Sequence, residues 1–218
     1  MYRFLILILI LILILILILN FFHAHPTYAS DTDCPSKTLV NGVADLRCWN
    51  GIDVIPLSGD WLLNYETLDG TPVYKGAATL PINLDTDGPE VPFLGRGVYR
   101  ATIQLSEPSD NIALQLSHCY MARKVILVDS TGQQKILFDS GSTENTAHTI
   151  VKMRTPLIHL GTMGTQSELI VITNNTESLH NTGEDPLLLG SPAKLSRQSQ
   201  LLKYVSIVVS MILFFSGS

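Results

Sequence analysis

The sequence predicts a mainly β fold, an antiparallel sandwich or jelly roll, flanked by a hydrophobic segment at each end. Short runs of alternating apolar and polar residues are separated by turn residues, at intervals of about 8–12 residues. Helical periodicity is scarce between these runs, so the helices that a parallel α/β domain needs are missing. Apolar residues fill positions 4–19 and dominate positions 204–215.

The clearest predicted strand covers residues 98–105, where apolar and polar side chains alternate from Ala101 to Leu105. Residues 124–128 form a fuller apolar run, which indicates a strand covered on both faces. Trp61 is predicted to be a core residue, because apolar neighbours on both faces of its strand indicate a covered strand. The predicted strands are residues 52–57, 59–65, 98–105, 112–116, 124–128, 135–138, 157–160 and 168–173.

The N-terminus has the features of a secretory signal peptide. Arg3 supplies a positive charge, residues 4–19 are a continuous Leu/Ile-rich run, and Pro26 breaks the helix before a small-x-small site that ends at Ala29. We expect cleavage after Ala29. The alternative is an uncleaved anchor, because the run is only slightly shorter than the ~20 residues that span a bilayer. Either way, the following domain is predicted to be exported.

Charge and cysteine usage limit the possible partners and the compartment. Residues 30–200 hold 12 of the 14 Lys and Arg residues and all 19 Asp and Glu residues, a net charge of −7. An acidic domain without a basic stripe argues against binding to nucleic acid. In an oxidising compartment, Cys34 and Cys48 are predicted to form a disulfide, and Cys119 is then a buried thiol.

Several segments, in order, resemble one family. They are residues 55–61 (IPLSGDW), 91–100 (VPFLGRGVYR), 127–133, 140–141, 168–175 and 189–192. This series resembles the jelly-roll extracellular domain of bacterial seven-transmembrane receptors with diverse intracellular signalling modules (7TMR-DISM). The sugar-binding domain of the β-galactosidase family has a similar layout. The resemblance implies a galactose-binding-like sandwich, tethered to a membrane by the segment that follows it.

Motifs for catalysis, metal binding and phosphate binding are missing from the sequence. No Gly-x-Ser-x-Gly elbow occurs, the histidines are scattered, and Gly95–Gly97 precedes a predicted strand rather than a helix. We therefore expect no enzymatic activity, no metal and no cofactor. Ligand binding remains, since jelly rolls bind carbohydrate on a sheet face or at a loop rim. The candidate ligand-binding residues are Arg96, Tyr99, Arg100 and Asn175. The alternative is that the arginines are solvated and Tyr99 is core.

The C-terminal apolar run is predicted to begin a transmembrane helix. Counted from Tyr204, it is shorter than the ~20 residues that cross a bilayer, and no Lys/Arg cluster closes it. We therefore expect these residues to be the front part of a longer, multi-span protein; the alternatives are a short terminal anchor and a truncated gene product. The predicted parts are a signal peptide or anchor (1–29), a Cys-bearing segment (30–50), a β-sandwich sensor domain (51–193), a juxtamembrane linker (194–203) and the start of a transmembrane helix (204–218).

The function predicted from these features is ligand sensing at the cell membrane, by a domain on the periplasmic or extracellular side. The ligand is a small molecule, with a carbohydrate as one possibility, and the sequence leaves the oligomeric state open. Two alternatives stay open as well. One is a membrane-anchored binding module with no signalling role, and the other is an accessory sugar-binding domain of a hydrolase.

Overall fold

The chain divides into two compact units, Met1–Asp33 and Cys34–Ser218. The computed structural model describes residues 38–80, 90–92, 94–116, 121–141, 143, 156–176 and 187–216, all of which belong to the second unit. The predicted export segment, Cys34 and Cys119 lie outside the described residues. Cys48 is described, and its thiol is exposed and free. Because Cys34 is not described, the predicted Cys34–Cys48 bridge stays a prediction.

Seven strands form the larger of two sheets, in the order β4-β3-β5-β10-β7-β8, with β1 paired to β5. Neighbouring strands are antiparallel except for the parallel pair β1 and β5. The first part of the long strand β5 pairs with β3 and its last four residues pair with β1. The strands are β1 (Val43–Leu46), β3 (Gly59–Glu66), β4 (Pro72–Leu80), β5 (Gly95–Leu105), β7 (Ala122–Val128), β8 (Gln134–Asp139) and β10 (Gln166–Asn175).

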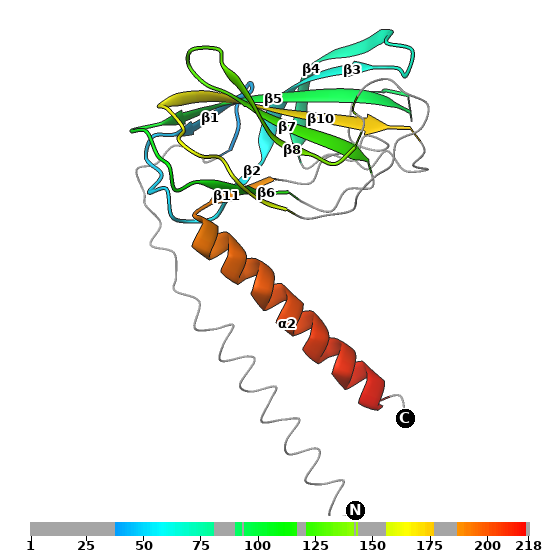
Figure 1. Ribbon diagram of the computed structural model, residues 1–218. Coiled ribbons are helices and arrows are strands. Elements are labelled where there is room, and N and C mark those ends of the chain that lie inside the picture. The colour runs from blue at the N-terminus through cyan, green and yellow to red at the C-terminus, as the bar shows by residue number, and fades with distance from the viewer. Residues whose placement is uncertain are drawn as a thin grey trace, which may run out of the picture. The chain divides into compact units, whose positions relative to one another are not determined.

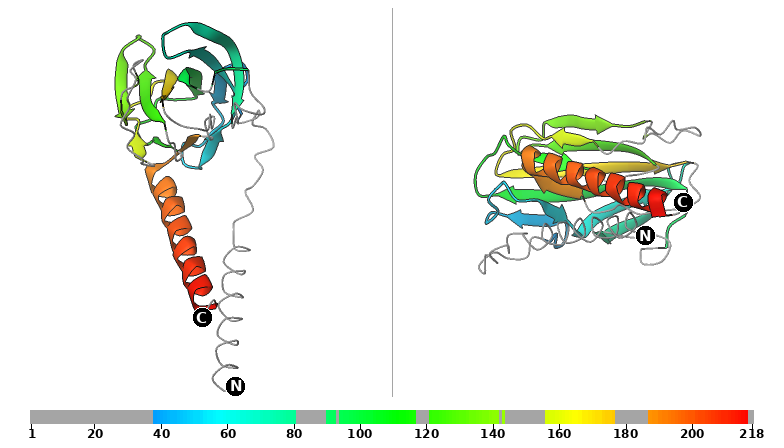
Figure 2. Two further views of the ribbon diagram at one scale, coloured as in Figure 1. Left: turned by 90° about the vertical axis from the view of Figure 1, so that its right-hand side faces the viewer. Right: turned by 90° about the horizontal axis from the view of Figure 1, so that it is seen from below.

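Four short antiparallel strands form the second sheet, in the order β2-β11-β6-β9. Figure 1 shows this smaller sheet as a layer beneath the larger one, and the end-on view in Figure 2 shows the two layers facing each other. The predicted mainly β, antiparallel sandwich is therefore confirmed. The strands of the smaller sheet are β2 (Ile55–Leu57), β6 (Ala113–Gln115), β9 (Leu157–His159) and β11 (Leu187–Gly190).

The core lies between the inner faces of the two sheets. Along β5, buried and half-buried residues alternate without interruption, as expected for a strand with one face on the core. Trp61 has no exposed surface, which confirms the prediction that it is a core residue. The prediction that the strand of Trp61 is covered on both faces is wrong, because the neighbouring Leu62 is 48% exposed. In β7, likewise, Ile126 on the outer face is only half-buried, although Ile170 and Ile172 on the same face of β10 are buried.

All eight predicted strands occur, and three strands were not predicted: β1, β4 and β11. Residues 129–133 form the turn that joins β7 to β8. There the Asp129 carboxylate accepts hydrogen bonds from the backbone N–H groups of Thr131 (2.9 Å) and Gln133 (3.0 Å) and from the Thr131 hydroxyl. The Thr131 hydroxyl is the main reason why the pKa of Asp129 lies below its ordinary value.

Helix α2 (Pro192–Ser216) follows β11 closely in the chain. Residues 194–203, predicted to be a linker, form its first half, because Ser191 and Pro192 supply the capping residue and the first helical residue that start a helix. The helix contacts β6, β9 and β11 of the smaller sheet. Of the helical residues that the structure describes, no stretch has the length and apolarity needed to cross a lipid bilayer. The predicted membrane segments stay predictions.

Candidate functional site

The structure separates the four predicted ligand-binding residues. Arg96 and Arg100 lie on the outer face of β5, whereas Tyr99 lies on its inner face and is buried in the core. Arg100 is held by an ion pair with Glu168 of β10, with 3.2 Å between Nη1 and Oε1. Asn175 is buried at the end of β10, in register with Gly95. Of the four, only Arg96 and Asn175 lie at the same end of the sheet.

Polar residues gather at this end, where β3 and β10 end and β5 and β7 begin. It lies at the tip of the β10 arrow in Figure 1. On the outer face, Glu66, Arg96 and Asn174 are neighbours across β3, β5 and β10. On the inner face, Thr173 of β10 lies in register with Arg123 of β7. We call this group the polar strand ends: Glu66, Arg96, Arg123, Thr173, Asn174 and Asn175.

Arg96 is, with Glu66, one of the two accessible charged groups of the polar strand ends. Its Nη1 lies 2.8 Å from Glu66 Oε1, and both side chains are 28% exposed. Its Nε, by contrast, is buried and has no hydrogen-bond partner in the described part of the chain. A buried donor without a partner costs about 1–3 kcal/mol.

Arg123 is a buried cation on the inner face. Its backbone is fixed by Ser140, whose hydroxyl accepts from Arg123 N (2.8 Å) and whose N–H donates to Arg123 O (2.9 Å). Arg123, Asn174 and Asn175 each make a further interaction within the protein. These three residues therefore give the polar strand ends a fixed frame, and Arg96 and Glu66 are the groups of this frame that meet solvent.

Tyr65 closes the inner side of this end. Its hydroxyl donates to the carbonyl oxygen of Pro92 (2.9 Å), and its ring lies so close to Gly95 that a Cβ there would come within 2.6 Å of it. A ligand is therefore expected to approach Arg96 from the outer face. Guanidinium and amide groups can donate to hydroxyl or carboxylate oxygens of a ligand, and a carboxylate can accept from its hydroxyl groups.

The sequence analysis missed Glu66, Arg123, Thr173 and Asn174. Arg123 carried a usable signal, because the alternation through Val125 and Leu127 places it on the inner face, where a charge is unusual. Glu66 carried none, since its role depends on the pairing of β3 with β5. Among the residues that the structure describes, no three His, Cys, Asp or Glu side chains come together to hold a metal ion.

Comparisons with known proteins give few relationships. No family model matches the chain, and no curated protein matches it. The similar solved structures include two of a GH2 beta-galacturonidase from Eisenbergiella tayi. One is bound to galacturonate (16% identity, TM-score 0.44) and the other to glycerol (14% identity, TM-score 0.43). Each similarity covers 64% of this chain and 24% of the enzyme chain, so the chain spans about a quarter of the enzyme's length. Similarity at this level assigns the chain neither a family nor a ligand.

Proposed function

We propose that this chain is the exported ligand-binding domain of a membrane-attached sensor. Its ligand is a small molecule rich in hydroxyl groups, such as a carbohydrate, and the polar strand ends bind it. The observation that carries the proposal is the partly exposed guanidinium of Arg96, a residue that lies between Glu66 and Asn174 in the sheet and whose Nε lacks a partner in the described part of the chain. A ligand oxygen that meets the exposed edge of this guanidinium gains a hydrogen bond from a charged donor, worth about 1.5–3 kcal/mol.

The proposal is for binding without chemistry, since the sequence carries no motif with a catalytic mechanism. Export is supported by the apolar run that follows Arg3. The sensing part of the proposal is supported by chain connectivity. Sixteen residues separate Asn175 from Pro192 at the start of α2, and they include β11, which contacts the helix.

The test compares Arg96→Gln with Arg100→Gln in the full chain, held in detergent. Both arginines lie on the same strand and the same face, and both form an ion pair with a glutamate. Thermal unfolding is followed with a panel of neutral monosaccharides and uronates. A sugar present at about 100 times its Kd stabilises the native state by about 2.7 kcal/mol.

We expect at least one sugar to raise the Tm of the wild-type chain and of Arg100→Gln. In Arg96→Gln this stabilisation is expected to fall to about 0.4–1.4 kcal/mol, with a smaller Tm shift, because the affinity falls about 10- to 100-fold with the charged donor removed. If Arg96→Gln keeps the full shift, the ligand binds elsewhere. If no sugar raises the Tm of the wild-type chain, the carbohydrate proposal is wrong.

A second measurement separates a sensor from an anchored binding module without a signalling role. Hydrogen exchange of the α2 amides is followed with and without the sugar that raises the Tm. A sensor changes exchange in α2 on binding, whereas a simple binding module changes it only near the polar strand ends.

A further inference from the structure

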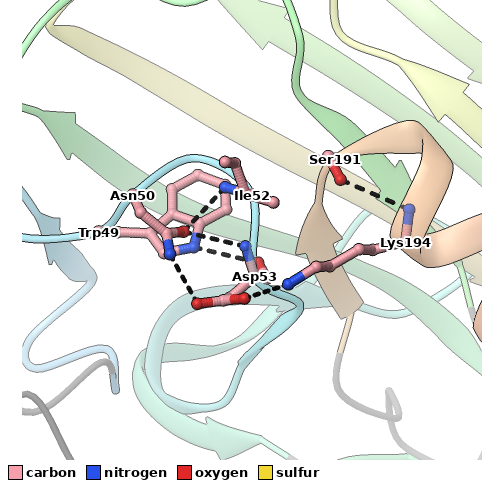
Figure 3. Close-up of polar contacts among 6 residues, drawn as sticks. All are labelled: Trp49, Asn50, Ile52, Asp53, Ser191 and Lys194. Carbon is pink, nitrogen blue, oxygen red and sulfur yellow. Dashed lines mark hydrogen bonds and ion pairs between the residues drawn. The ribbon is translucent and has the colours of Figure 1, made fainter. Parts of the chain in front are cut away.

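The loop that leads into β2 is locked by its own hydrogen bonds (Figure 3). Asn50 Oδ1 accepts from the backbone N–H groups of Ile52 (2.9 Å) and Asp53 (3.0 Å), and Asn50 Nδ2 donates to Asp53 Oδ2 (2.7 Å). Trp49 Nε1 donates to the carbonyl oxygen of Asp53 (3.0 Å). The Asp53 carboxylate is therefore held in one place before it meets any partner.

The start of α2 lies against this loop. Ser191 caps the helix, since its Oγ accepts from Lys194 N (3.4 Å) and its carbonyl oxygen accepts from Leu195 N (3.1 Å). Ser191 N also donates to the carbonyl oxygen of Ile52 (3.3 Å), which ties the cap to the loop. Leu195 has no exposed surface, so the first turn of the helix is packed into the sandwich.

The charge of this first turn is unusual. It contains no acidic residue and places Lys194 where a helix dipole favours negative charge. The missing carboxylate comes from another element, because Asp53 Oδ1 pairs with Lys194 Nζ (Figure 3). An exposed ion pair alone contributes little, since ordering two free side chains costs entropy. Here Asn50 has already ordered one of the two partners.

We propose that Asp53 is a positioning residue that fixes the direction of α2 on the sandwich. Asn50, Asp53, Ser191 and Lys194 form what we call the helix clasp. Through it the loop and the first turn of α2 move as one piece, so any displacement of the loop is passed to the helix. This inference does not depend on a ligand at the polar strand ends.

The test measures how firmly α2 is held in the full chain in detergent. Spin labels on a ketone-bearing amino acid replace two exposed residues, Val40 on the sandwich and Tyr204 on the helix, so that the native cysteines stay unlabelled. We expect a narrow distance distribution in the wild-type chain and a broad one in Asp53→Asn and Lys194→Gln. Amides of residues 193–198 are expected to exchange about three to ten times faster in both variants. Lys194→Arg keeps the charge and is expected to retain the narrow distribution.

The control is Asp139→Asn, which breaks a comparable Lys–Asp pair between β8 and β7 (3.3 Å from Lys124). It is expected to leave the Val40–Tyr204 distances unchanged. The proposal is overturned if Asp53→Asn keeps the narrow distribution or if Asp139→Asn broadens it equally. It is also overturned if Asp53→Asn raises exchange in β10 as much as in α2, because Asp53 then stabilises the whole sandwich.

Discussion

Trp61 shows how far one residue can be understood from sequence. Its indole is buried, and its Nε1 donates to the carbonyl oxygen of Leu57 (3.1 Å), so the one polar atom of the ring is satisfied inside the core. The core position was predicted correctly, but for a partly wrong reason. The outward side chain of Leu62 is half-exposed, so the strand is covered on one face only.

We predict that Trp61→Ala lowers the free energy of unfolding by about 3–5 kcal/mol, because it leaves a large cavity and an unpaired carbonyl group in the core. Ile136→Ala is the control, since Ile136 is an exposed apolar residue of β8 and its loss is expected to cost about 0.5 kcal/mol or less. Urea unfolding of the full chain in detergent measures both. Equal losses in the two variants would contradict the core assignment.

The polar strand ends show which site residues sequence can and cannot give. Arg96 and Asn175 were predicted from polar residues in segments that resemble a receptor family, and they do lie at one end of the sheet. Arg100 lies further along the same strand, where Glu168 pairs with it. Glu66 was not predicted, because it joins Arg96 only through the pairing of β3 with β5. Contacts of this kind depend on strand register across the fold, which a local pattern does not contain.

Individual strands were predicted well where alternation was strong and poorly where it was weak. β5 has a complete two-residue period, and its strand was predicted. β4 contains Pro, Gly, Lys and Ala, which are depleted in strands, and most of its residues are exposed at the edge of the sheet. β11 is an apolar run of only four residues, which has too few positions to show a period.

We predict that Gly59→Ala disrupts the junction between the segment around Leu39 and the start of β3. Gly59 has a φ of 108°, and a Cβ there would lie 2.3 Å from the carbonyl oxygen of Leu39. That oxygen accepts a hydrogen bond from Asp60 N (2.9 Å), so it cannot move away without cost. The expected loss of unfolding free energy is about 3 kcal/mol, of which the positive φ accounts for about 1–2 kcal/mol.

Gly132→Ala separates these two contributions. Gly132 has a φ of 85°, and nothing lies within 4 Å of its added Cβ, so only the backbone term applies. Urea unfolding is expected to give a loss of about 1–2 kcal/mol for Gly132→Ala, smaller than that for Gly59→Ala. Equal losses would mean that the clash with Leu39 is relieved by a small backbone shift.

At the scale of the whole molecule, composition and turn spacing were enough to predict an antiparallel sandwich, but not its strand order. β10 lies between β5 and β7, and β1 joins the far half of β5 in parallel. These pairings join residues that are far apart in the chain, and each depends on the others. The start of α2 was missed for the same reason, because Leu195 is buried by a sandwich that its local sequence does not specify.

Export of the domain predicts a disulfide between Cys34 and Cys48. Cys48 is exposed, and an exposed thiol in an oxidising compartment is expected to find a partner. The bridge closes a loop of about 15 residues, which stabilises the fold by about 3 kcal/mol in the chain-entropy treatment. Mass spectrometry of the non-reduced, exported chain is expected to show a linked Cys34–Cys48 peptide. The same link is expected in Cys119→Ser and to be missing from a chain without residues 1–29 that is made in the cytoplasm. A Cys34–Cys119 link, or two free thiols in the exported chain, would contradict this pairing.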